Sequence, residues 1–132
     1  MKNRFIFISL IALFCASLAW AHHSVPGRYD YEAEITLTGK ITRVDWINPH
    51  VRIFLDVTGA DGSVTTWELA SAPAQFMRRA GISKSKLMND GGEPVKILGI
   101  RSRHPDLNHI WAYRIDYADG HFYQLSTRRP SS

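Results

Sequence analysis

Apolar and polar residues alternate along much of the chain from residue 35 onward, which is typical of β-strands with one buried face. The first alternating run covers residues 35–47 and is interrupted by Gly39, so it predicts one long strand that bends at the glycine. Asn48-Pro49 ends this run, because proline fixes φ and has no amide hydrogen to donate. A second strand is expected to follow over residues 51–57.

The next segments predict a hairpin and then a helix. Asp61-Gly62 is a hairpin signal, and residues 64–69 alternate again, which completes a three-stranded meander. Between residues 71 and 81 the apolar period lengthens to that of a helix. Pro73 suits the first turn and Gly81 suits the end, so one short helix is predicted here.

The last third of the mature chain returns to strand character. Residues 94–100 predict a fourth strand, and residues 110–117 predict a fifth, whose alternation places four residues on one face: Trp111, Tyr113, Ile115 and Tyr117. A second Ala-Asp-Gly turn, residues 118–120, leads into residues 121–125. Three strands, a helix and two more strands predict an all-β fold with one short helix, a small OB-like barrel of five to six strands. An SH3-like barrel is the alternative.

The N-terminus has the pattern of a secretory signal peptide. Lys2 and Arg4 precede the apolar run 5–18, and the small residues of Ala19-Trp20-Ala21 provide cleavage points after Ala21 or after Ala19. The run is shorter than the roughly 20 residues of a membrane span, so no stable anchor is expected after cleavage. We therefore predict a periplasmic or secreted protein with four segments: a signal peptide 1–21, an extended segment 22–34, the barrel 35–126 and a flexible tail 127–132.

Removal of the signal peptide changes the meaning of the composition. The chain of 132 residues has sixteen Lys and Arg against twelve Asp and Glu, but Lys2 and Arg4 are removed, so fourteen remain and the net charge falls from +4 to +2. Both signs are interspersed, which argues against a nucleic-acid partner. The single cysteine, Cys15, is also removed, and this excludes a disulfide or a thiolate metal site in the mature chain.

Several motifs of the mature chain occur together in one known group of proteins. They are His22-His23-Ser24, residues 37–41, Trp46 with Asn48-Pro49-His50, Trp67, Ala72-Pro73 and residues 78–81. With these motifs the chain resembles an uncharacterised family of small exported bacterial proteins, a domain of unknown function. The resemblance implies a periplasmic single-domain β-barrel, and it implies no activity.

The six histidines carry the chemical signal. Cleavage after Ala21 makes His22 the N-terminal residue, so its amine and imidazole can chelate one copper(II) ion, which favours such nitrogen ligands. Cleavage after Ala19 puts the same histidine third, which also permits a square-planar copper or nickel site. His50, in the loop between the first two strands, is the second candidate ligand; His23, His104 and His109 are weaker ones.

The positions of the loops support this set. In an OB barrel, the loop between strands one and two and the loop between strands four and five border the ligand-binding face. His50 belongs to the first loop, and His104 and His109 belong to the second. His121 follows the second Ala-Asp-Gly turn and is expected on the opposite rim, so it is not part of the candidate site.

Other interpretations remain open at this level. A His-His terminus is often only solvated, and His50 can simply hydrogen-bond within its turn. Trp46, Trp67 and Trp111 fit the core, but exposed aromatics would instead indicate a metal-independent carbohydrate, peptide or protein-interaction module. A small copper oxidoreductase is a third hypothesis.

The chain has no glycine-rich phosphate loop and no His-Glu-x-x-His motif, so we predict no catalytic residues. We therefore favour binding over catalysis, with an unknown periplasmic ligand or protein as the partner.

Overall fold

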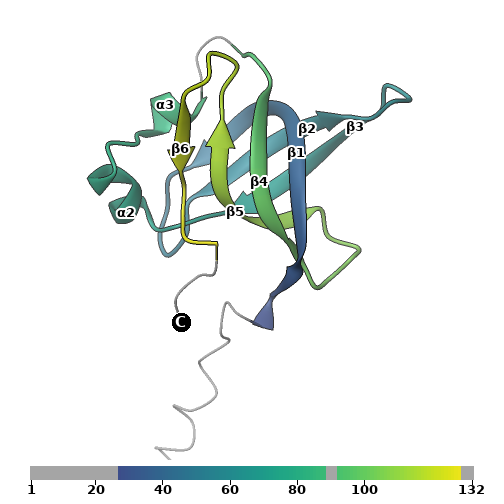
Figure 1. Ribbon diagram of the computed structural model, residues 1–132, viewed down its shortest axis with the longest axis horizontal. Helices are drawn as coiled ribbons and strands as arrows, with labels where there is room; N and C mark the ends of the chain where they lie inside the picture. Colours follow the sequence, from purple (N-terminus) through teal and green to yellow (C-terminus); the bar gives the residue numbers. More distant parts are fainter. Residues whose placement is uncertain (1–26, 89–91, 129–132) are drawn as a thin grey trace, which may run out of the picture.

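The computed structural model describes residues 27–88 and 92–128 (Figure 1). Within these residues one sheet of six strands is accompanied by short helices. In chain order the elements are β1 (Tyr29–Asp45), β2 (Arg52–Thr58), β3 (Val64–Ala70), α2 (Ala74–Arg79), α3 (Lys84–Met88), β4 (Val95–Ser102), β5 (His109–Asp116) and β6 (Phe122–Gln124). The predicted signal peptide, His22 and His23 lie outside the described residues.

Strand pairing closes the sheet into a barrel. β1 pairs antiparallel with both β2 and β4, β2 pairs with β3, and β4 pairs with β5. A short parallel ladder between β3 and β5 completes the ring. This order, β1-β2-β3-β5-β4 and back to β1, is that of an OB barrel, with β6 added beside β5. The expected all-β, OB-like barrel is confirmed.

β1 is the strand that links the two halves of the barrel. Up to Gly39 it pairs with β4, and from Lys40 onward it pairs with β2. A Cβ atom at Gly39 would lie 2.3 Å from the carbonyl oxygen of Asp56, so only glycine permits this approach of the two backbones. The predicted glycine bend therefore marks the change of pairing partner.

β1 also begins at Tyr29, earlier than the Ile35 that the alternation predicted. Residues 29–34 alternate as well, but every second residue is Asp or Glu, which are depleted in strands and hid the pattern. Tyr29 is 1% exposed and packs with Ile100 and Trp111 in a second, smaller core cluster. The strand thus carries the chain into the barrel directly after residue 28.

The prediction that four residues of β5 share one face was wrong. Ile115 and Tyr117 pack in the main core, whereas Trp111 and Tyr113 belong to the smaller cluster. The register against β4 shifts between Leu98 and Gly99, so β5 carries one extra residue at this point. Such a bulge reverses the face on which the following side chains lie.

Two short helices, rather than the one predicted, fill the connection from β3 to β4 among the described residues. α2 follows Pro73 and ends before Gly81, whose φ of 74° terminates it as expected. α3 comes directly afterwards and buries Leu87, while α2 buries Met77. Both helices lie on the same side of the barrel (Figure 1). None of the helices in residues 27–88 and 92–128 has the length and apolar character needed to span a bilayer.

Candidate functional site

A cavity of about 600 Å³ opens between the β1–β2 loop, residues 46–51, and the β4–β5 loop, residues 103–108. The two loops approach each other because β1, β2, β4 and β5 belong to the same closed barrel. The cavity is lined by Arg28, Ile47, Asn48, Pro49, His50, Arg52, Glu68, Ala70, Ser102, His104, Leu107 and His109. It lies where OB barrels bind their ligands.

His50 is held in a defined orientation at this cavity. Its Nδ1 lies 3.0 Å from the carbonyl oxygen of Ser71 and donates a hydrogen bond to it, since a carbonyl can only accept. The ring also packs edge-on against Trp111, with centroids 5.3 Å apart. A proton on Nδ1 leaves the lone pair of the neutral ring on Nε2. Histidine ligands of metals are commonly oriented by a backbone carbonyl in this manner.

His109 pairs with Tyr29 at the start of β5. The Tyr29 hydroxyl lies 2.7 Å from His109 Nε2, and the two rings stack with centroids 5.6 Å apart. Burial raises the pKa of Tyr29 to about 12 and lowers the pKa of His109, so the phenol donates and the neutral imidazole accepts. The Nε2 lone pair of His109 is therefore already in use.

Charged groups surround this pair. The pKa of His109 is lowered mainly by burial; Glu68 opposes this effect, and Arg28 and Arg52 add to it. Arg52 and Glu68 form an ion pair of 3.6 Å between half-exposed side chains. Since Arg28 also lines the cavity, the fixed charges of its wall sum to a positive value before any histidine is counted.

Three of the five predicted metal ligands line this one cavity. His50 and His109 are partly buried, and His104 is exposed on the β4–β5 loop, where its backbone N–H bonds to Ser102 Oγ at 3.1 Å. His22 and His23 lie outside the described residues. Within the residues that the structure describes, no three His, Asp or Glu side chains are arranged to share a metal ion.

Sequence reasoning missed the polar partners of these histidines. The sequence pattern places Tyr29 and Arg28 in an extension before the barrel, and it gives Arg52 and Glu68 no distinct role. A signal for the last two was present, because Arg52 follows the His50 loop directly and β2 pairs with the strand that carries Glu68. Their convergence with His109, however, depends on the parallel β3–β5 ladder, which pairs Glu68 with His109.

The tryptophans serve the core, as expected. Trp67 and Trp111 are buried, Trp46 packs against the main cluster, and Trp111 Nε1 donates to the carbonyl of Thr127 at 3.0 Å. Among the described residues no Trp or Tyr is exposed. The row of solvent-facing rings on which a carbohydrate-stacking surface would depend is thus missing from this part of the chain.

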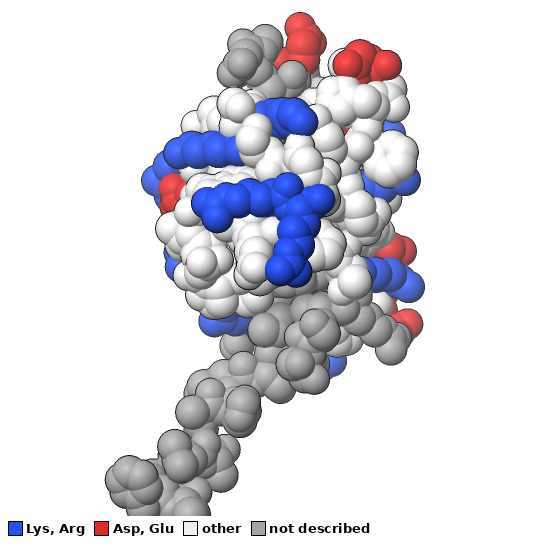
Figure 2. All heavy atoms as spheres, turned by 90° about the vertical axis from the view of Figure 1, so that its left-hand side faces the viewer, with Lys and Arg blue, Asp and Glu red and all other residues white. Residues whose placement is uncertain are grey.

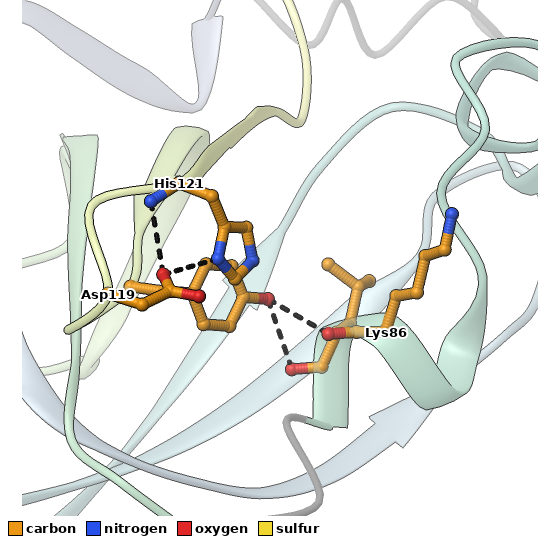
Figure 3. Close-up of polar contacts among 5 residues, drawn as sticks. Lys86, Asp119 and His121 are labelled. Atoms are coloured by element: carbon orange, nitrogen blue, oxygen red, sulfur yellow. Dashed lines mark hydrogen bonds and ion pairs between the residues drawn. The ribbon is translucent and has the colours of Figure 1, made fainter.

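His121 lies away from the cavity. It follows the C-terminal end of β5, whereas His109 begins that strand. Its ring stacks on Tyr117 with centroids 4.2 Å apart, and its Nδ1 pairs with the carboxylate of Asp119. Figure 3 shows this arrangement beside the end of α3, so the prediction of an opposite rim is confirmed.

Comparison with known proteins gives a family without an assigned activity. The family model described as a family of unknown function, DUF6152, matches residues 11–108, a range that includes His50 and His104 and ends directly before His109. No curated protein and no solved structure matches the chain. The match covers more than half of the sequence, and the chain therefore belongs to DUF6152.

Proposed function

We propose that this protein is an exported binding module that holds a late transition metal, copper(II) in particular, between its mature N-terminus at His22 and the cavity histidine His50. The observation that supports the proposal most is that His50, from the β1–β2 loop, shares one cavity with His104 of the β4–β5 loop and His109 at the start of β5. Copper(II) favours nitrogen ligands, and the chain offers no thiolate after export.

The orientation of His50 suits this role. Its Nδ1–H donates to Ser71, so Nε2 is the nitrogen that can ligate a metal. His109 is less suited, because Tyr29 already donates to its Nε2. His104 and His23 would complete the set as secondary donors.

The covalent distance from the cavity to the N-terminal amine is short. Arg28 lines the cavity, and His22 precedes it by six positions. An extended chain of that length spans at most about 20 Å. The amine and imidazole of His22 are thus tethered within reach of His50, and together they would supply three nitrogen donors from two residues.

A calorimetric copper titration of protein that has been processed in its host tests the proposal, with the mature N-terminus established by mass spectrometry. We expect His22→Ala and His50→Ala each to weaken copper binding by at least about tenfold, the lower bound for groups that support a metal ligand. An alanine inserted before His22 keeps the imidazole but displaces the amine, and should cause a comparable loss.

His121→Ala is the matched control, because His121 lies at the opposite rim and should leave the affinity unchanged. Unchanged affinity after His22→Ala would remove the N-terminal chelate from the proposal. A processed wild-type protein that binds no copper would overturn it entirely.

One observation favours a second function, a metal-independent peptide module. Ile47 and Leu107 are 42% and 52% exposed, and they line the same cavity from its two loops. Apolar side chains on either side of a polar cleft suit an extended peptide. Peptide-induced NMR shifts of Ile47 and Leu107 that persist with a metal chelator present would favour this function, and their absence would count against it.

The third reading, a copper oxidoreductase, requires turnover. It predicts peroxide-dependent oxidation by the copper-loaded protein that is lost in His22→Ala. A copper-loaded protein without such turnover would leave binding as the function.

A further inference from the structure

The α2–α3 basic face is a second surface feature, distinct from the cavity. We give this name to Arg78 and Arg79 at the end of α2 together with Lys84 and Lys86 of α3, all of which are exposed. Figure 2 shows these helices' side of the barrel, across which blue basic side chains gather. None of the four residues lines the cavity.

These cations lack the acidic neighbours found elsewhere on the barrel. Residues 71–88 contain no Asp or Glu. The described residues contain no carboxylate within ion-pair distance of any of the four, whereas Arg43, Arg52, Arg114 and Arg128 each have one. Arg78 instead lies over the Trp46 ring, 5.9 Å from its centroid. Among residues 27–88 and 92–128, the positive charge of this face is therefore not paired with a carboxylate.

Buried side chains hold the two helices of the basic face against the barrel. Met77 and Leu87 are fully buried and fix α2 and α3 against the barrel. The Tyr117 hydroxyl donates to the carbonyl oxygens of Lys86 and Leu87 at 3.2 and 3.4 Å, and Figure 3 shows Lys86 held in this way beside His121. Lys86 Nζ donates to the carbonyl of Gly81 at 2.7 Å, which ties α3 to the turn after α2. The helices that carry the cations, and the ammonium group of Lys86, thus have defined positions on the surface.

An apolar side chain accompanies the charges. Phe76 is 42% exposed on α2, three residues before Arg79, so the two share one helix face. Four cations and an aromatic ring on protruding helices form a surface suited to an extended anionic layer with an apolar interior. An anionic bilayer supplies both negative headgroups for the cations and an apolar interior for Phe76.

We propose that the α2–α3 basic face docks on an anionic phospholipid surface, with its four cations at the headgroups and Phe76 at the acyl boundary. The docking is peripheral and reversible. It is independent of the metal, because the face shares no residue with the cavity.

Vesicle co-sedimentation of the processed protein tests this proposal, with phosphatidylcholine vesicles that either contain or lack phosphatidylglycerol. We expect binding only to the anionic vesicles, and loss of binding at high salt because surface charges are then screened. Each cation near such a surface contributes about a fivefold gain in partition, so Lys84→Gln/Lys86→Gln and Arg78→Gln/Arg79→Gln should each reduce binding about 25-fold.

The matched control is Lys40→Gln/Lys96→Gln, which removes the same charge from exposed lysines of β1 and β4. It should change vesicle binding far less than the lysine pair of α3. Phe76→Ser should weaken binding to anionic vesicles while leaving its dependence on salt in place. Circular dichroism checks that every variant remains folded.

Three results would overturn the proposal. The first is equal binding to vesicles with and without phosphatidylglycerol, and the second is an equal loss in the control and in the α3 variant. The third is the absence of vesicle binding; salt-sensitive binding to duplex DNA or polyglutamate that depends on the same four cations would then identify a different anionic partner.

Discussion

The cavity and the α2–α3 basic face differ in how their charged groups are compensated. At the cavity, Arg52 has a carboxylate partner, and burial keeps both Tyr29 and His109 neutral. On the basic face, four cations lie exposed without a described carboxylate partner, on helices fixed by buried apolar anchors. A concave site with neutral imidazoles suits a ligand that is held by donated lone pairs, whereas an exposed cationic face suits a partner that brings its own negative charge.

The two regions are nevertheless connected through the main chain. His50 donates to the carbonyl of Ser71, in the segment that leads from β3 into α2. The N–H of Val51 donates to the carbonyl of Ala72 at 3.2 Å, and the N–H of Ser71 donates to the carbonyl of Val51 at 3.0 Å. A change that acts on the barrel should therefore affect both regions, and local changes test how strongly this connection couples them.

The largest effect is expected from Gly39→Ala. Its new Cβ would collide with the backbone of Asp56, at the point where β1 changes partner, and we expect a loss of about 2–3 kcal/mol in the free energy of unfolding. Urea unfolding followed by tryptophan fluorescence measures it. Thr38→Ala, at the exposed neighbouring position, is the control and should stay within about 0.5 kcal/mol of the wild type. Equal stability of the two variants would contradict the close approach at Gly39.

Tyr117→Phe should destabilise the α2–α3 basic face while leaving the cavity unchanged. Loss of the hydroxyl removes the hydrogen bonds to α3 and is expected to cost about 1 kcal/mol. Amide hydrogen exchange should accelerate at Leu87, whose N–H bonds to Ser83, and stay unchanged at Ser71 beside His50. Tyr123→Phe serves as the control on the adjacent strand. Faster exchange at Ser71 as well would show that the regions do not open independently.

His109, at the cavity, should contribute to the pH dependence of stability. Burial lowers the pKa of His109 below its ordinary value of 6.5, so the unfolded chain takes up this proton first as the pH falls. The contribution of His109 is thus complete above pH 6.5 and decreases below it. Urea midpoints measured on both sides of that pH should fall less steeply in His109→Gln, and NMR titration of the ring should locate the lowered pKa. A ring that titrates at or above 6.5 would contradict the burial.

The smallest change in stability is expected from Arg52→Gln, which should act on the cavity alone. Its ion pair with Glu68 is 3.6 Å long and half-exposed, so stability should change by less than about 0.5 kcal/mol. Because Arg52 lines the cavity, its removal should strengthen the binding of the copper cation. Removing a cation from the basic face should instead weaken vesicle binding. Weaker copper binding in Arg52→Gln would show that the cavity is not the metal site.

Particular residues show how far the sequence could predict this fold. Gly39, the Asp61-Gly62 turn, Pro73 and Gly81 each signalled a bend, a hairpin or a helix end, because their backbone constraints act locally. The bulge on β5 had no such signal, since an extra residue in one strand is defined only against its partner. The early start of β1 was hidden because its acidic residues are poor strand formers in isolation.

The candidate site was likewise predictable from the sequence only in part. That His50, His104 and His109 lie at one end of the barrel could be predicted, because the order of strands and the helix place their loops there. That Tyr29 donates to His109, and that Ser71 orients His50, could not be predicted. These contacts join residues far apart in sequence, and hydrogen bonds of that kind leave no periodic trace in the chain.

The sequence by itself determined the class of the protein: alternation and turn residues specified an OB-like barrel, and the histidines offered the chemistry. Tertiary structure decided which histidines share a cavity and which nitrogen is free to ligate. It also decided that the cations of residues 78–86 gather on one exposed face. The reason is physical: backbone preferences act over a few residues, whereas proton positions, burial and charge compensation depend on neighbours that only the closed barrel brings together.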